Sequence, residues 1–302
     1  MGIGDDAALI NPSQNQQLVV ASDTLVESVH FPASATGRQI GTRALCVNLS
    51  DMAAMGANPR WFTLALTLPA DKANSAWLAG FSEGIAEIAG QFDIALVGGD
   101  TTGGPLTVSM TLIGEVPAGE SLQRSGAAVG DTVFVTGTLG DGAAGLNLIP
   151  RKNSINTDSD RLLQRFYAPQ PQIETGINLR TIASACIDIS DGLVADLGHI
   201  CQASGVAATV FTQELPLAEE LRKLAPESCL DWALFGGDDY QLCFTVSADR
   251  LATVEQLIER GELNASKIGS IEASGTSGNL VTVLDTSGKP VAVNKQGYDH
   301  FG

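Results

Sequence analysis

Short apolar runs of the strand type alternate with longer segments of helical periodicity along most of the chain. Strands are predicted at 18–22, 61–68, 94–97, 106–116, 133–136, 187–190, 241–246, 268–271 and 280–284. Helices are predicted at 41–55, 75–92, 160–167, 172–186, 191–203 and 248–260, and another begins near Gly142. This alternation is typical of α/β or α+β folds. We therefore expect an α/β (α+β) fold, in which the last two strands belong to an antiparallel closing sheet.

A polar, turn-rich segment at 117–130 separates two series of these elements. The 302 residues suit one large domain or two of ordinary size, and 44% hydrophobic residues are enough for sizeable cores. We place the boundary inside this segment, which predicts an N-terminal domain at 1–122 and a C-terminal domain at 123–302.

Acidic residues outnumber basic residues, 34 to 17, so the net charge is −17. Such a surface repels nucleic acid and anionic membranes, and neither is expected as a partner. No run of about 18 apolar residues occurs, so no membrane span is expected. The five cysteines form no C-x-x-C pair and the N-terminus lacks signal-peptide features, which favours a cytoplasmic protein with reduced thiols.

Aspartates recur at the ends of apolar runs or beside glycine. They are Asp5, Asp6, Asp23, Asp51, Asp100, Asp188, Asp191, Asp238 and Asp239. Ligand sites of α/β proteins form at strand ends, and carboxylates that converge there need a counter-charge. Mg²⁺ prefers oxygen ligands, and neighbouring glycines let the backbone approach phosphates. The set predicts a magnesium-dependent polyphosphate site, although each aspartate alone could be a helix cap or turn residue.

Other nucleotide and hydrolase motifs are absent or incomplete. The sequence contains no P-loop, no G-x-S-x-G elbow, and no histidine or cysteine cluster of the zinc-binding kind. Residues 140–145 fit G-x-G-x-x-G after a predicted strand, but no strand-end acid follows about 20 residues later. We interpret these glycines as a turn that starts a closely packed helix.

Two residues outside the aspartate set are candidate ligands. His30 lies in a polar-flanked loop after the first predicted strand, where it could contact a substrate. Arg124 lies in a loop beside glycine and is a candidate phosphate ligand, although an ordinary surface arginine is the simpler interpretation. His199 falls inside a predicted helix and is expected to be structural.

Taken together, these motifs resemble the thiamine-monophosphate kinase family in their order along nearly the whole chain. The matching segments are 2–8, 22–24, 30–31, 47–57, 98–102, 124–126, 188–193, 237–240 and 297–301. The wider superfamily includes aminoimidazole ribonucleotide synthetase, selenophosphate synthetase and a hydrogenase maturation protein. The resemblance implies a two-domain fold, in which a mixed sheet with helices precedes a C-terminal α/β domain. It also implies homodimers that bind ATP with several Mg²⁺ ions.

The resemblance further implies that ATP phosphorylates thiamine monophosphate to the diphosphate by direct transfer. It assigns magnesium to Asp6, Ser22, Asp23, Asp51, Asp100, Asp188 and Asp191. It assigns ATP contacts to Gly99, Asp100, Arg124 and Ser190, and substrate contacts to His30, Asp239 and Tyr298. Asp51 and Asp191 are the leading catalytic candidates, because each follows an apolar run.

Two alternatives remain. A sister activity of the superfamily is the first, although the reactive residue near the N-terminus of selenophosphate synthetases has no counterpart here, since the first cysteine is Cys46. The second is a nucleotide-binding regulator without catalysis. Family members usually carry a further segment before the Gly2-Ile3-Gly4-Asp5-Asp6 motif, whereas this chain starts on it. That segment is expected to support the sheet, the dimer or the nucleotide site.

Overall fold

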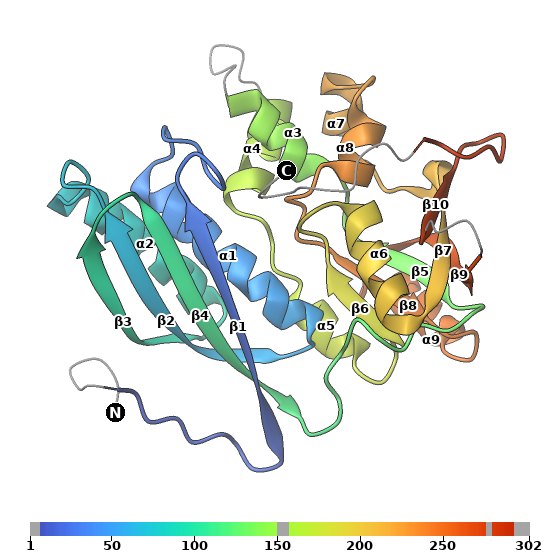
Figure 1. Ribbon diagram of the computed structural model, residues 1–302, viewed down its shortest axis with the longest axis horizontal. Helices are drawn as coiled ribbons and strands as arrows, with labels where there is room; N and C mark the ends of the chain where they lie inside the picture. Colours follow the sequence, from blue (N-terminus) through green and yellow to red (C-terminus); the bar gives the residue numbers. More distant parts are fainter. Residues whose placement is uncertain (1–6, 150–156, 276–279, 293–302) are drawn as a thin grey trace.

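The computed structural model describes residues 7–149, 157–275 and 280–292. It contains two separate sheets with helices packed on and between them (Figure 1), which confirms the predicted fold class. The predicted boundary at 122/123 lies in the segment that joins the sheets and stays a prediction. In the described part of the chain, no helix is long and apolar enough to cross a membrane.

The first sheet has the strand order β1-β4-β2-β3. Its strands are β1 (Gln16–Val26), β2 (Asn58–Leu68), β3 (Ala95–Gly103) and β4 (Thr107–Pro117). β4 pairs antiparallel with β1 and β2, whereas β2 and β3 are parallel. Helices α1 (Gly37–Ala54) and α2 (Ser75–Gln91) cover one face of the sheet, and no described element covers the other (Figure 1).

The second sheet has the order β10-β7-β9-β5-β8-β6. Its strands are β5 (Thr132–Thr136), β6 (Ala185–Asp188), β7 (Val206–Phe211), β8 (Leu242–Val246), β9 (Ala265–Ala273) and β10 (Val281–Leu284). β9 pairs antiparallel with β5 and β7, but β10 runs parallel to β7. The expectation that β10 belongs to an antiparallel arrangement is therefore wrong, because β7, which sequence reasoning missed, lies between β9 and β10.

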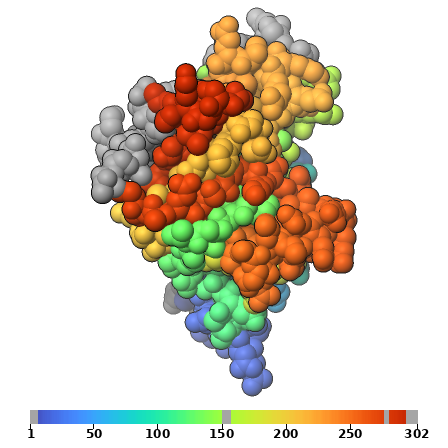
Figure 2. All heavy atoms as spheres, turned by 90° about the vertical axis from the view of Figure 1, so that its right-hand side faces the viewer, coloured from blue at the N-terminus to red at the C-terminus, as the bar shows by residue number. Residues whose placement is uncertain are grey.

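The helices of the second half are α3 (Asp141–Leu148), α4 (Thr157–Tyr167), α5 (Ile173–Leu179), α6 (Leu193–Ser204), α7 (Glu219–Leu224), α8 (Cys229–Phe235) and α9 (Leu251–Glu259). The helix predicted at 172–186 ends early as α5, because 185–188 pair with β8 to form β6. Seen from the right-hand side of Figure 1, the surface consists mainly of this half of the chain, with the N-terminal part showing below (Figure 2).

The glycines at 140–145 start α3, as predicted, and they serve close packing. A Cβ atom on Gly142 would lie 2.1 Å from the Asp238 carbonyl oxygen, and one on Gly145 would lie 2.2 Å from that of Leu162. The preceding strand β5 pairs antiparallel with both neighbours, unlike the parallel strands of a dinucleotide-binding fold.

Helix α1 lies between the two sheets and is buried along most of its length. Thr36 starts it with a capping box that includes Gln39. The apolar side of α1 belongs to a core cluster that also includes Phe134 and Phe244 of the second sheet. Because one core spans both sheets, α1 can hold residues of the two halves in a fixed relation.

Candidate active site

A cavity of about 680 Å³ takes its wall from both halves of the chain. Its lining comes from β1, the β1–α1 loop, α1, α3, and the loops β6–α6 and α8–β8. The polar members of this lining are Ser22, Asp23, Thr24, His30, Arg43, Asp51, Asp188, Ser190, Asp191, Asp238 and Tyr240. This volume is typical of small-molecule sites. Most of the predicted site residues therefore lie around one cavity.

The Asn48–Asp51 segment of α1 forms hydrogen bonds to both sheets at the cavity. The Asn48 side-chain oxygen accepts a hydrogen bond from the Asp23 backbone N–H of β1, at 3.2 Å. The Ser50 hydroxyl donates to Asp188 at the end of β6, at 2.7 Å. Asp51, the next residue, lines the cavity. Asn48 and Ser50 thus position Asp23 and Asp188, and Asp51 itself faces the cavity.

The carboxylates of the cavity are close enough to disfavour one another's charge. Burial, together with the negative charges of Asp188 and Asp23, raises the pKa of Asp51 to about 8. Burial also raises the pKa of Asp188, against the hydrogen bond from Ser50. The positive charge of Arg124 partly opposes the rise at both. The site therefore favours a ligand that brings positive charge.

The donor atoms suit magnesium in their chemistry. Asp23, Asp51, Asp188 and Asp191 offer carboxylate oxygens, and Ser190 offers a hydroxyl, which are the hard ligands that Mg²⁺ prefers. Among the described residues, no three His, Cys, Asp or Glu side chains already form a group that could hold a metal ion. A Mg²⁺ ion that keeps waters and substrate oxygens as ligands needs only one or two of these carboxylates.

A buried acid holds the turn that carries Ser190 and Asp191. The side chain of Asp196, on the first turns of α6, accepts the backbone N–H groups of Ser190, Asp191 and Gly192 through one oxygen, at 3.0–3.1 Å. Burial, together with the charges of Asp188 and Asp191, raises the pKa of Asp196 to about 8. The backbone N–H groups of this turn are therefore engaged within the protein.

The loop between α8 and β8 has an unusual backbone. Gly237, Asp238 and Tyr240 have φ values of +66°, +62° and +50°. The two non-glycine residues are strained in this left-handed region. The loop is held by backbone bonds from Asp238 N–H to the Ser190 carbonyl (2.9 Å) and from Tyr240 N–H to the Ile189 carbonyl (2.8 Å). Strain of this kind is common at functional sites.

The structure corrects the expected role of Asp239. Its two carboxylate oxygens accept the backbone N–H groups of Gly140 (2.7 Å) and Gly142 (3.1 Å) at the start of α3. The side chain is buried there and does not line the cavity, which its neighbour Asp238 does. In an extended or strained loop successive side chains diverge, and the sequence alone could not select between two adjacent aspartates.

Gly99 and Asp100 also lie apart from the other candidates. Asp100 pairs with Ala65, in a row that continues through Ser109 to Thr24. The next row, Leu66, Val108 and Leu25, is buried under the helices, so Asp100 lies on the uncovered face. Asp100 therefore does not line the cavity that Asp51 lines, and its assignment to magnesium and ATP stays a prediction. A Cβ atom on Gly99 would lie 1.9 Å from the Leu64 carbonyl oxygen, so close packing against β2 explains why a glycine occupies this position.

The remaining candidates have mixed outcomes. His30 lines the cavity, and its Nδ1 accepts the Val26 backbone N–H at 3.0 Å. Arg124 is exposed near the cavity and influences Asp51 and Asp188 through its charge. Asp6 and Tyr298 lie outside the described residues.

Sequence reasoning missed Arg43 and Asp196, both buried at the site. A single arginine among the apolar residues of the helix predicted at 41–55 was a signal for Arg43, because a buried cation needs partners.

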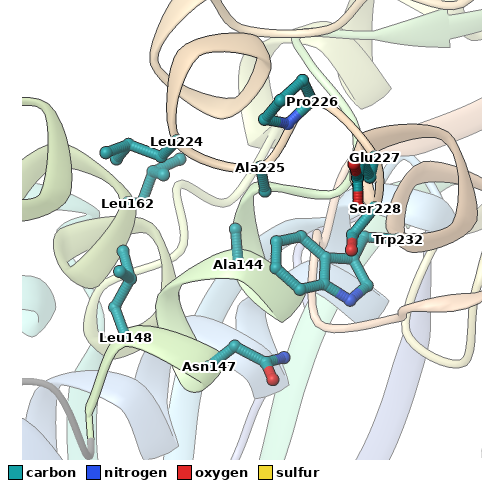
Figure 3. A pocket seen from close by; sticks show the side chains of 10 residues that line it. All are labelled: Ala144, Asn147, Leu148, Leu162, Leu224, Ala225, Pro226, Glu227, Ser228 and Trp232. Atoms are coloured by element: carbon teal, nitrogen blue, oxygen red, sulfur yellow. The ribbon is translucent and has the colours of Figure 1, made fainter.

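A smaller cavity of about 280 Å³ lies on another side of α3 (Figure 3). Trp232 of α8 faces Leu148 and Asn147 of α3 across it, and Leu224 and Pro226 close its upper side. None of the residues expected at the site lines this cavity. It therefore adds no candidate to the active site.

Comparison with known families agrees with the fold. Residues 4–116 match the model of the AIR synthase related protein N-terminal domain, and residues 128–280 match that of the C-terminal domain. Among solved structures, thiamine-monophosphate kinase from Stenotrophomonas maltophilia is 45% identical with a TM-score of 0.87, covering 96% of this chain and 92% of that one. The complex of AaThiL with AMPPCP and TMP is 33% identical with a TM-score of 0.84, covering 96% and 89%.

Curated relatives give the same result. Thiamine-monophosphate kinase of Salmonella typhimurium is 44% identical over 99% of this chain and 91% of its own length. That of Bacillus subtilis is 37% identical over 100% of this chain and 93% of its own length. The chain therefore belongs to the thiamine-monophosphate kinase family of AIR synthase related proteins.

Proposed function

We propose that this chain transfers the γ-phosphoryl group of ATP to thiamine monophosphate and so forms thiamine diphosphate. The observation that carries the proposal is the carboxylate-lined cavity between the two halves of the chain, in a protein 33% identical to AaThiL complexed with AMPPCP and TMP. The cavity is lined by the carboxylate oxygens of Asp23, Asp51, Asp188 and Asp191 and also by His30 and Asp238.

The chemistry needs positioning more than it needs a base. An oxygen of the acceptor phosphate is already ionised near neutral pH. It forms the new bond to the γ-phosphorus, while the bond to the β–γ bridging oxygen breaks and ADP leaves with that electron pair. The protein must hold two polyanions in line and compensate their charge. We assign no covalent nucleophile, and transfer is direct.

Magnesium fits this reaction and this donor set. When bound, Mg²⁺ supplies positive charge that offsets the phosphate charges. We propose Asp23, Asp51, Asp188 and Asp191 as its protein ligands, because their carboxylates surround one cavity. Asp6 and Ser22 remain proposed ligands. Ser190 and Arg124 are the proposed ATP contacts at the same end, where Arg124 already influences Asp51 and Asp188.

We also propose a homodimer formed through the uncovered face of the first sheet. Leu18 and Val20 of β1 are 44% and 61% exposed. Val20 is paired through Ile113 to Trp61, so an apolar row crosses this face. A second copy would cover it and would bring Gly99 and Asp100 into an interface. A cytoplasmic location is part of the proposal, supported by five free, buried cysteines.

The decisive experiment is product analysis in a single turnover. The protein is mixed with ATP and Mg²⁺ and with thiamine monophosphate, and products are identified by mass. Thiamine diphosphate and ADP are expected in equal amounts, with loss of activity on chelation and recovery when Mg²⁺ is added back. Binding of both ligands without diphosphate would favour a regulator. Turnover only with another acceptor would favour a sister activity.

A further inference from the structure

Arg43 of α1 is the one arginine among the described residues that line the active-site cavity, and 2% of its side chain is exposed. Burial lowers the pKa of the guanidinium, but the charges of Asp238 and Tyr240 and the hydrogen bond to Asp238 together raise it by more, so the guanidinium stays charged. The guanidinium stacks on the Phe166 ring, with 4.1 Å between the Cζ atom and the ring centroid. A buried cation in a fixed stack has little freedom to move.

The guanidinium fork joins three separate segments of the chain. Nε donates to the His30 carbonyl oxygen at 3.1 Å, and Nη1 donates to the Phe166 carbonyl oxygen at 2.5 Å. Nη2 donates to Asp238 Oδ1 at 2.5 Å. One side chain thus connects the β1–α1 loop, the end of α4 and the α8–β8 loop. No single-headed cation such as lysine can serve three acceptors in this geometry.

The Asp238 partner lies in the strained loop. Tyr240 donates its hydroxyl proton to the same Asp238 oxygen, at 3.2 Å, and its ring centroid lies 5.8 Å from the Arg43 Cζ atom. Positive φ values at Asp238 and Tyr240 persist only when the surroundings hold them. The Arg43 contact is one such restraint, from the half of the chain opposite to the loop.

We propose that Arg43 is a positioning residue, which fixes His30 and Asp238 on two sides of the cavity and so determines affinity for thiamine monophosphate. This inference rests on the proposed function. Within the described residues, the hydrogen bonds of Arg43 reach His30, Phe166 and Asp238, and none reaches Asp51, Asp188, Ser190 or Asp191. The Arg43 side chain therefore contacts the segments of His30 and Asp238 directly, and it reaches the proposed ATP contact Ser190 only through the backbone of Asp238.

The test compares Arg43→Lys and Arg43→Met with matched variants of Arg38. Arg38 lies on the same helix but is exposed, and it pairs with Glu83 and Glu87 of α2. Calorimetry measures the Kd for thiamine monophosphate without ATP, and steady-state kinetics measure both KM values. For Arg43→Lys we expect Kd and KM for thiamine monophosphate to rise about tenfold. A displacement of substrate-contacting residues by about 1 Å is enough to cause a loss of this size. The KM for ATP should stay within about twofold.

Arg43→Met should raise the same constants further, with lysine giving partial rescue, and Arg38→Met should change neither. If Arg43→Met does not fold, Arg43→Lys and Asp238→Asn together supply the test. Both substitutions disrupt the same Arg43–Asp238 contact, so in the double variant their effects on Kd should be less than additive. Equal loss for both substrates, or additive effects, would overturn the inference. A wild-type protein that binds thiamine monophosphate but forms no diphosphate would instead contradict the proposed function.

Discussion

Asp51 is a carboxylate inside a mostly buried helix, next to two other carboxylates. Such a residue is costly unless a bound cation or a proton compensates its charge. Its pKa of about 8 expresses that cost. The presence of a buried carboxylate beside two others is best explained by a ligand that supplies positive charge.

Replacement of Asp51 by asparagine keeps the size of the side chain and removes its charge. We expect kcat to fall by about 100-fold or more, because charge stabilisation at a transferring phosphoryl group is lost. Kinetics at saturating Mg²⁺ and circular dichroism measure activity and fold. Asp71→Asn, at an exposed carboxylate outside the cavity, should leave kcat unchanged. Near-normal turnover of Asp51→Asn would contradict the proposed metal site.

Asp141 predicts a pH dependence of stability. Its Oδ2 accepts the Thr138 hydroxyl proton at 2.5 Å, while its buried Oδ1 has no hydrogen-bond partner among the described residues. Burial raises its pKa, against Thr138 and Arg165. Because the folded pKa exceeds the unfolded one, the folded state binds the extra proton. The stabilisation from this group is complete below the unfolded pKa and is lost as pH rises through the folded pKa.

Asp141→Asn removes this titration and keeps the shape. We expect the variant to become more stable relative to the wild type, as a difference in unfolding free energy, when pH rises from about 4 to about 7. Urea unfolding at several pH values measures the difference. A wild type that gains stability relative to the variant over this range would show that Arg165 and the helix N-terminus outweigh burial.

At the scale of elements, glycines set the distance between α1 and α2. A Cβ atom on Gly41 would lie 2.4 Å from the Phe81 carbonyl oxygen, and one on Gly84 would lie 2.3 Å from that of Arg38. The helices approach so closely that backbone meets backbone. This contact supports α1, and α1 carries both Arg43 and Asp51 into the cavity.

Gly84→Ala and Gly90→Ala form a matched pair on α2. The added methyl group at 84 collides with the α1 backbone, so we expect a loss of roughly 1–3 kcal/mol in unfolding free energy. At 90 nothing lies within 4 Å of the new atom, and alanine should be neutral or stabilising by up to about 1 kcal/mol. Denaturant unfolding measures both. Equal effects at the two positions would show that the helix contact is adaptable.

At the scale of the molecule, the two sheets share one core, but the outer face of the first sheet has no cover in the chain. Val20→Lys places a charge in its apolar row. We expect the mass in solution to change from dimer to monomer, measured by sedimentation, because a buried unpaired lysine is costly. Val129→Lys, at a comparably exposed valine in the second half, should leave the mass unchanged. A monomeric wild type would contradict the proposed dimer.

The residues alone determined the alternation of strands and helices, and with it the fold class. They also located the acids that line the cavity. These features depend on local periodicity and on motif order, which a chain displays without folding. Family membership could likewise be expected from motifs spread over nearly the whole length, and comparison confirmed it.

Only the tertiary structure decided which residues meet. Strand register placed Asp100 on the uncovered face, and the strained loop turned Asp238 toward the cavity and Asp239 into a cap for α3. Pairing with β8 made residues 185–186, which were predicted to end a helix, part of the strand that was predicted to begin at 187. Arg43 acquired its role from partners 123 and 195 positions away along the chain. Contacts at such separations depend on packing, which no local pattern encodes.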